Sequence, residues 1–145
     1  MGRALARLHQ RTPEAGLGSR TPSEVENVRS ALAHGEPFPS PFVRVSADAI
    51  ERTVSTLPNA NGPVWTHGAP LVESALLVDS IVTFEPAGSD GFDPPERDLA
   101  IVLRSVAETF TSEVARTFMD GYEEAGGLLP QPGALDWYGL LAAFR

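Results

Sequence analysis

Residues 65–79 read Trp-Thr-His-Gly-Ala-Pro-Leu-Val-Glu-Ser-Ala-Leu-Leu-Val-Asp, and this stretch decides the fold that the sequence predicts. It ends in the apolar run Ala75–Val78, and a second apolar run, Ile81–Phe84, follows after Asp79 and Ser80. Two short apolar runs separated by two polar residues are typical of a β-hairpin. We therefore expect one small hairpin here, preceded by a loop that contains His67 and Gly68.

The rest of the chain shows helical patterns. Apolar residues recur at three- and four-residue spacing, and the polar starts at Thr21-Pro22 and Ser46 are typical of helix N-termini. Glycines at 35, 126 and 127 mark helix ends, and the Gly- and Pro-rich range 85–95 is expected to be a loop. The sequence predicts a mainly α fold with one small β-hairpin, in a single domain over residues 1–145. The expected helices cover residues 3–9, 21–34, 46–57, 97–110, 113–125 and 133–144.

Composition excludes several kinds of chemistry. The chain has no Cys, so disulfides and thiolate metal sites are ruled out. All 11 basic residues are Arg, which removes Schiff-base chemistry and a phosphate-binding Lys. The net charge of −8 argues against nucleic acid or an anionic membrane as a partner, and is compatible with a basic peptide or a cationic small molecule. There is no apolar run of transmembrane length and no signal-peptide core, so we expect a cytoplasmic protein.

The His67-Gly68 loop, with Ser74 and the apolar strand after it, resembles the catalytic loop of the aminoglycoside and choline phosphotransferases, a kinase-like family. Other segments resemble further pieces of that family in the same order. These are Arg3–His9, Ile81–Pro86, Gly91–Ala100, Phe118–Gly127 and Leu135–Tyr138. The resemblance covers most of the chain, and it implies a kinase-like C-terminal lobe without the β-rich first lobe.

The resemblance also implies that three chemical positions are changed. Ala69 stands where the family has its catalytic Asp, Ser74 where it has a metal-binding Asn, and Thr83 where it has a second metal-binding Asp. Phosphoryl transfer needs a carboxylate near the acceptor and oxygen ligands for Mg²⁺. Glu85, two residues beyond Thr83 on the same strand face, could replace only one ligand.

The residues that shape the loop in the family are retained. The resemblance implies that His67 and Gly68 set the loop backbone and that Asp98, at the entry to the next helix, braces it. Two interpretations of His67 stay open: a hydrogen-bonded, half-buried structural histidine, or an acid–base group in an enzyme with a different reaction.

Other polar and aromatic residues are candidates for binding. Asp90, Asp93, Glu96 and Asp98 are expected to form an acidic patch, either a solvated loop and helix entry or a cation site. Glu123, Glu124 and Asp136 flank the segments that resemble the family's substrate side. Trp65 and Trp137 are core or rim aromatics, or, if exposed, interface residues. No metal site is expected, because His9, His34 and His67 lie far apart in the sequence.

These observations favour a pseudokinase without cofactors. It would act as a binding or accessory component for a partner enzyme or a peptide substrate in bacterial specialised-metabolite biosynthesis. Exposure of the apolar surface that normally meets the first lobe predicts a homo- or hetero-oligomer. One alternative is a repurposed enzyme, such as a cyclase or its helper acting on a Ser-, Thr- and Cys-rich lanthipeptide precursor, with His67 as the acid–base group. Another alternative is a fragment whose first lobe is encoded separately.

Overall fold

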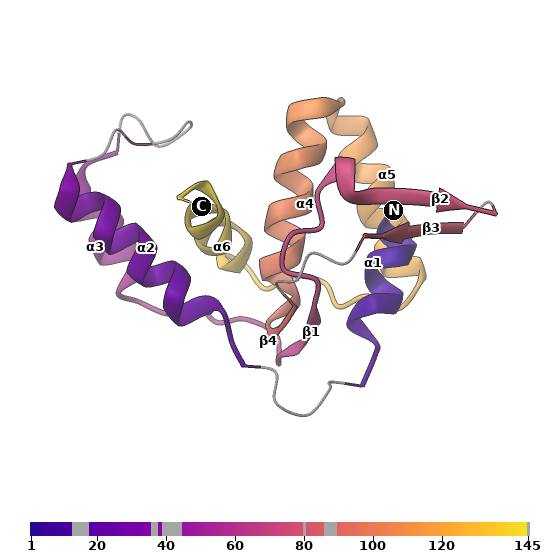
Figure 1. The fold of residues 1–145 in the computed structure, drawn as a ribbon, viewed down its shortest axis with the longest axis horizontal. Helices are drawn as coiled ribbons and strands as arrows, with labels where there is room; N and C mark the ends of the chain where they lie inside the picture. The colour runs from indigo at the N-terminus through magenta and orange to yellow at the C-terminus, as the bar shows by residue number, and fades with distance from the viewer. Residues whose placement is uncertain (13–17, 36–37, 39–44, 80, 86–89, 145) are drawn as a thin grey trace.

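A computed structural model describes residues 1–12, 18–35, 38, 45–79, 81–85 and 90–144. The mainly α fold with a small hairpin is confirmed (Figure 1). The elements are α1 (Gly2–His9), α2 (Thr21–His34), α3 (Ala47–Val54), β1 (Val64–Thr66), the 3₁₀ turn η2 (Val72–Ser74), β2 (Ala75–Val78), β3 (Ile81–Phe84), β4 (Gly91–Asp93), α4 (Pro95–Thr109), α5 (Ser112–Glu124) and α6 (Ala134–Ala143).

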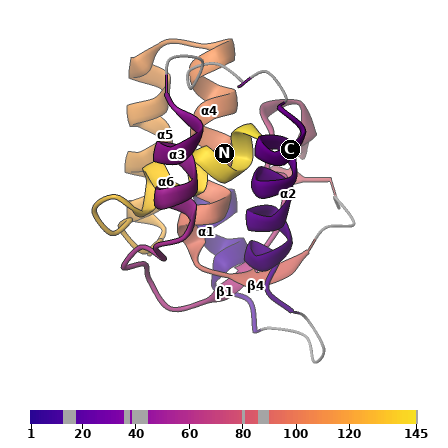
Figure 2. The same cartoon turned by 90° about the vertical axis from the view of Figure 1, so that its left-hand side faces the viewer.

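Helix α4 is the central element, and apolar clusters lie on two of its sides. On one side Leu99, Val102 and Val106 pack with residues of α1 and α5, including Leu5 and Tyr122. On the other side, α6 and the α2–α3 pair form a second cluster around Ala100 of α4 (Figure 2). This arrangement explains why the sequence of α4 is apolar on more than one face.

The two strand pairs differ in how far the sequence predicted them. The hairpin β2–β3 forms as expected, with Ala75 opposite Phe84 and Val78 opposite Ile81, and Asp79 adopts a positive φ of 49° in its turn. The second pair, β1–β4, was missed: Val64–Thr66 pairs antiparallel with Gly91–Asp93, which the sequence analysis assigned to a loop. Strands of three residues are too short to show an alternating pattern, and their pairing depends on distant residues.

The sequence predicted some of the helix ends correctly and others incorrectly. Ser46 caps α3, because its side chain accepts a hydrogen bond from the amide of Ala49, and Gly35 ends α2 with a φ of 66°. Thr21 is not the N-cap of α2; that position is Arg20, and the Thr21 hydroxyl donates to Asp93 instead. The helix expected over residues 46–57 is shorter than predicted: α3 ends at Val54, and Leu57 lies beyond it and is 73% exposed.

Helices α1 and α5 approach closely at a glycine. A Cβ atom added to Gly2 would lie 1.9 Å from the backbone oxygen of Phe118 and 2.8 Å from the backbone nitrogen of Tyr122. Because these are backbone atoms, they cannot move aside as a flexible side chain would. The position of α1, and of His9 at its end, therefore depends on the absence of a side chain at residue 2. Within the described residues, none of the helices has the length and hydropathy that a membrane crossing requires.

We predict that Gly2→Ala lowers the free energy of unfolding by about 1–3 kcal/mol, because the added methyl group forces α1 away from α5. The matched control is Gly139→Ala in α6, where an added Cβ meets no atom within 4 Å. That change should stabilise the protein by roughly 0.5–1 kcal/mol through helix propensity. Urea unfolding measures both, and a Gly2→Ala protein as stable as the parent would contradict the close approach.

Candidate functional site

The loop that resembles a catalytic loop is held by one buried carboxylate. Asp98, in the first turn of α4, is fully buried and accepts hydrogen bonds from the amides of His67 (2.6 Å) and Gly68 (3.0 Å). Gly68 has a φ of 89°, which allows both amides to face the same carboxylate. His9 of α1 contacts the same carboxylate through Nε2, at 3.3 Å. The bracing role that the resemblance implied for Asp98 is therefore visible in its contacts.

The surroundings of Asp98 stabilise its charged form. Burial acts to raise the pKa of this carboxyl, but the hydrogen bond and charge of His9 and the amides of His67 and Gly68 outweigh it, so the pKa lies below its ordinary value. His9 also bonds the Tyr122 hydroxyl through Nδ1, at 2.8 Å. Burial, followed by the charge of Glu96, raises the pKa of Tyr122 well above its usual range. Tyr122 therefore stays a neutral hydrogen-bonding group.

His67 is buried rather than half-buried, and both of its ring nitrogens have partners. Nε2 bonds the backbone carbonyl of Glu85, and Nδ1 accepts from the amide of Ala69 at 3.4 Å. Because a carbonyl can only accept, Nε2 is the donor in this hydrogen bond. The ring also packs against Phe84, with the ring centroids 5.5 Å apart. These contacts agree with the structural interpretation of His67.

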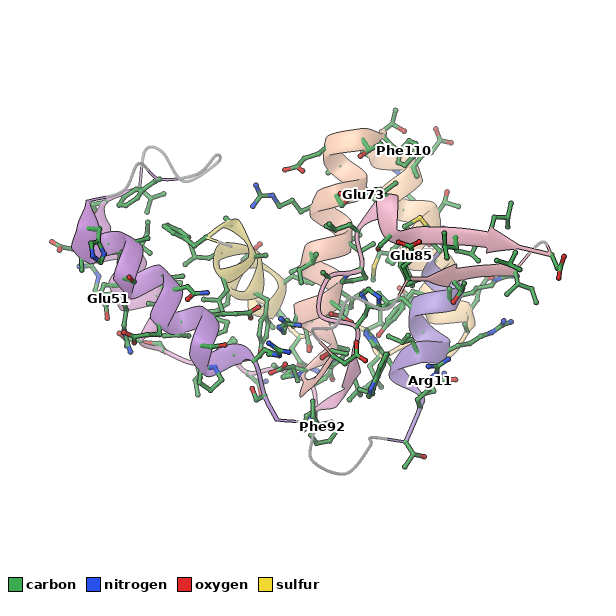
Figure 3. All side chains as sticks on the ribbon, viewed as in Figure 1. Arg11, Glu51, Glu73, Glu85, Phe92 and Phe110 are labelled. Carbon is green, nitrogen blue, oxygen red and sulfur yellow. The ribbon has the colours of Figure 1, made fainter. Side chains whose placement is uncertain are left out.

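Ser74, one of the changed motif positions, forms hydrogen bonds with the segments that contact the two ring nitrogens of His67. The Ser74 hydroxyl donates to the carbonyl of Leu71 (2.8 Å), inside its own turn, and the Ser74 carbonyl accepts from the amide of Glu85 (2.8 Å). The Ser74 hydroxyl also lies 3.4 Å from the carbonyl of Ala69, so hydrogen bonds of Ser74 connect Ala69 with Glu85. The side chains of Thr83 and Glu85 are exposed on β3 and just after it. Figure 3 shows Glu85 at the end of the hairpin that lies nearest α4.

The prediction of an acidic surface patch is wrong for three of its four residues. Asp93, Glu96 and Asp98 are completely buried, and only Asp90 is partly exposed. Asp93 accepts from the Arg20 amide at 3.0 Å and from the Thr21 hydroxyl at 2.9 Å. Carboxylates that already bind buried protein donors are structural groups, and they are not available to a cation in solvent.

Glu96 joins two loops in the same way. Its Oε1 accepts from the amide of Asn61 (3.1 Å), from the side-chain nitrogen of Asn61 (2.7 Å) and from the amide of Gln131 (3.0 Å). The loop before β1 and the loop before α6 are therefore both fixed to the first turn of α4.

A buried ion pair connects α2 to α4, and the sequence analysis missed it. Arg97 donates to Glu24 through Nε at 3.0 Å and Nη2 at 2.6 Å, and Asp93 and Asp98 lie within 4 Å of the guanidinium. Burial acts to lower the pKa of Arg97, but the bond to Glu24 and the three carboxylates outweigh it and raise the pKa. An Arg in the first turn of a helix opposes the helix dipole. That position was the one signal in the sequence that Arg97 needs acidic partners.

The remaining candidates lie apart from this loop. Glu124 forms an exposed ion pair with Arg3 (2.6 Å), and Glu123 is exposed on α5. Trp137 is only 4% exposed, and its indole nitrogen donates to the carbonyl of Thr53 at 2.9 Å. Trp65 is half-buried beneath the guanidinium of Arg11. In the described part of the chain, no group of three or more His, Asp or Glu side chains is arranged to hold a metal ion.

Comparison with known proteins identifies the fold. No family model and no curated protein matches the sequence. Among solved structures, an aminoglycoside-3'-phosphotransferase of type VIII matches 99% of this chain and 60% of its own, with 23% identity and a TM-score of 0.77. The aminoglycoside phosphotransferase APH(3'')-Id from Streptomyces rimosus matches 99% of this chain over 59% of its own length, with 18% identity and a TM-score of 0.77. A choline/ethanolamine kinase family protein from Mesorhizobium loti matches 99% of this chain over 48% of its own length, with 18% identity and a TM-score of 0.63.

The chain has the fold of part of an aminoglycoside phosphotransferase. It spans about 60% of the length of the two aminoglycoside phosphotransferases and about half of the choline kinase-like protein. The resemblance seen in the sequence is therefore confirmed at the level of fold.

We predict that the stability of the protein depends on the charge of Asp98. Because the pKa of Asp98 is lowered by folding, its contribution is complete above the unfolded pKa of about 3.9 and is lost as the pH falls through the folded value. Asp98→Asn should cost on the order of 3 kcal/mol at pH 6 and reduce the loss of stability below about pH 4. Urea unfolding at pH 3–6 measures this, with Asp120→Asn on the exposed face of α5 as the control. Equal stabilities of parent and Asp98→Asn at pH 6 would refute it.

We also predict that two Arg–Glu ion pairs, one buried and one exposed, contribute very differently to the free energy of unfolding. Glu24→Gln should lower the free energy of unfolding by about 3–5 kcal/mol, because it leaves the buried Arg97 without its main partner. Glu51→Gln breaks the exposed pair with Arg29 (3.2 Å) and should cost less than about 1 kcal/mol. Thermal or urea unfolding of the two variants tests this, and similar costs would mean that the Arg97 pair is not buried in solution.

Proposed function

We propose that this protein is a kinase-fold binding component that does not transfer phosphate. The observation that carries the proposal is the contrast within one loop. The Asp98 contacts to His67 and Gly68 build the loop backbone, while Ala69 at its centre has no polar side-chain atom.

The chemistry of phosphoryl transfer supports this proposal. The reaction needs a carboxylate that orients the acceptor and oxygen ligands that hold Mg²⁺ against the phosphates. Ala69 offers no carboxylate, and the Ser74 hydroxyl is bonded to the carbonyl of Leu71 within its own turn. None of the changed positions Ala69, Ser74 and Thr83 has a carboxylate, and Glu85, two residues beyond Thr83, adds only one, which is a poor Mg²⁺ site by itself.

An exposed apolar surface supports a binding role. On the hairpin, Leu77 is 72% exposed, Ile81 58% and Val78 54%. Ile81 also lines a groove of about 830 Å³ between the hairpin, α1 and α5, where Phe110 is 48% exposed. A two-stranded sheet that carries large exposed apolar side chains is marginal alone, and such a patch usually marks a protein partner. We propose that a partner protein covers this surface, either a second copy or a different chain.

The finer identity of the partner rests on the family resemblance alone. A partner enzyme, or a basic or Ser-, Thr- and Cys-rich peptide substrate in a bacterial specialised-metabolite pathway, remains our proposal for what is bound. The alternative of a peptide cyclase with His67 as its acid–base group gains no support from the geometry. Both ring nitrogens of His67 are engaged by the backbone, and the ring is buried.

We predict that the purified chain transfers no phosphate from Mg²⁺-ATP to a peptide or an aminoglycoside, because Ala69 supplies no carboxylate and Ser74 no amide ligand. The assay is release of ADP together with mass spectrometry of the acceptor. Activity that is lost in Glu85→Gln and kept in the exposed control Glu73→Gln would overturn the proposal.

We predict that a single charge on the hairpin abolishes partner binding. Leu77→Asp should release the proteins that co-purify with the tagged chain from its native host, or convert a homo-oligomer to a monomer. Leu57→Asp is the matched control, because Leu57 is 73% exposed and Leu77 72%, but Leu57 lies beyond α3. Quantitative mass spectrometry and light scattering give the readout. If partner binding is lost in neither variant, or is lost equally in both, the hairpin is excluded as the binding surface.

A further inference from the structure

The groove beside the hairpin carries two short rows of opposite charge. Arg3 and Arg7 lie one turn apart on α1, and both line the groove. Asp120 and Glu124 lie one turn apart on α5 and line it as well. Among the described residues, the charged side chains of the lining are these two basic and two acidic groups. A lining of this kind favours a partner that presents both signs of charge in a matching order.

Two of the four charges have no partner within the chain. Arg3 and Glu124 form the exposed ion pair with each other, at 2.6 Å. Arg7 and Asp120 are also exposed, but no hydrogen bond or ion pair of either side chain is found within the described residues. One free cation and one free anion therefore remain in the same groove.

These two free charges lie at opposite ends of the groove lining. Helices α1 and α5 run side by side in roughly the same direction (Figure 1). Arg7 is one turn beyond the position of the Arg3–Glu124 pair on α1, whereas Asp120 is one turn before it on α5. Along the two helices the surface is therefore positive at one end, neutral at the pair and negative at the other end.

A surface with this order of charges is complementary to itself. A two-fold axis through the neutral middle brings the positive end of one copy opposite the negative end of the other. We propose that a second copy of this chain covers the groove, in a two-fold dimer in which Arg7 of each copy pairs with Asp120 of the other. This inference rests on the proposed binding role, because it names the partner of the surface that the role uses.

Apolar side chains around the charges supply the rest of the contact. Phe110 at the end of α4, Val114 of α5 and Ile81 of the hairpin all line the groove and are all exposed. In a two-fold dimer each of them is covered by the same surface of the other copy, so the apolar area is removed from water twice. The charges then determine the register, because a shifted arrangement leaves Arg7 and Asp120 unpaired or places like charges together.

Charge reversal in the purified chain tests this pairing. Sedimentation equilibrium at micromolar concentration should show that the parent chain is a dimer. Arg7→Glu and Asp120→Arg should each raise the Kd of the dimer about tenfold or more, because the interface contains the pair twice and both contacts change from attraction to repulsion. Arg116→Glu is the matched control: it is exposed on α5 outside the groove lining, and its Kd should equal that of the parent.

The two weakened variants should restore the dimer in combination. In an equimolar mixture of R7E and D120R, both contacts of a heterodimer again join opposite charges, so the Kd should return to about the parent value. The double variant R7E/D120R should form a homodimer for the same reason. Native mass spectrometry of the mixture distinguishes the heterodimer from either homodimer.

Three results would overturn the inference: a monomeric parent chain, single variants that dimerise as the parent does, or a mixture that stays monomeric. The measurement on the parent chain needs no variant, so it decides the question even if a variant folds poorly. The proposed binding role is tested separately. If the parent chain is monomeric but Leu77→Asp still releases a protein that co-purifies with it, the binding role holds and the partner is a different chain.

Discussion

The buried carboxylate of Asp98 is the interaction on which the rest of this structure depends. Removing a carboxylate from water is costly unless donors replace its hydration. Here the amides of His67 and Gly68 and the imidazole of His9 supply those donors, from two separate segments of the chain. A single side chain in the first turn of α4 therefore fixes the position of α1 and the backbone of the central loop.

Neighbours of Asp98 extend this arrangement to the other half of the molecule. Asp93 holds the start of α2, Arg97 is paired with Glu24 inside α2, and Glu96 holds the loops at Asn61 and Gln131. The entry to α4 is thus a short polar segment that contacts most of the elements around it, between the two apolar clusters. These contacts are structural and do not depend on what stands at Ala69 or Ser74, so the loop keeps its shape without the groups that phosphoryl transfer needs.

The sequence by itself determined the helices and the hairpin, and its resemblance to the family implied the shape of the His67-Gly68 loop. The helices and the hairpin follow from local patterns, such as the apolar spacing of α4 and the two apolar runs around Asp79. Only the tertiary structure decided that Asp93 and Glu96 are buried acceptors, that Thr21 bonds Asp93 instead of capping α2, and that Arg97 pairs with Glu24. The physical reason is distance along the chain. A carboxylate in an acidic stretch looks solvated by pattern, and its burial depends on donors more than 70 residues away, as for Asp93 and Glu24, which are brought near only when the helices pack.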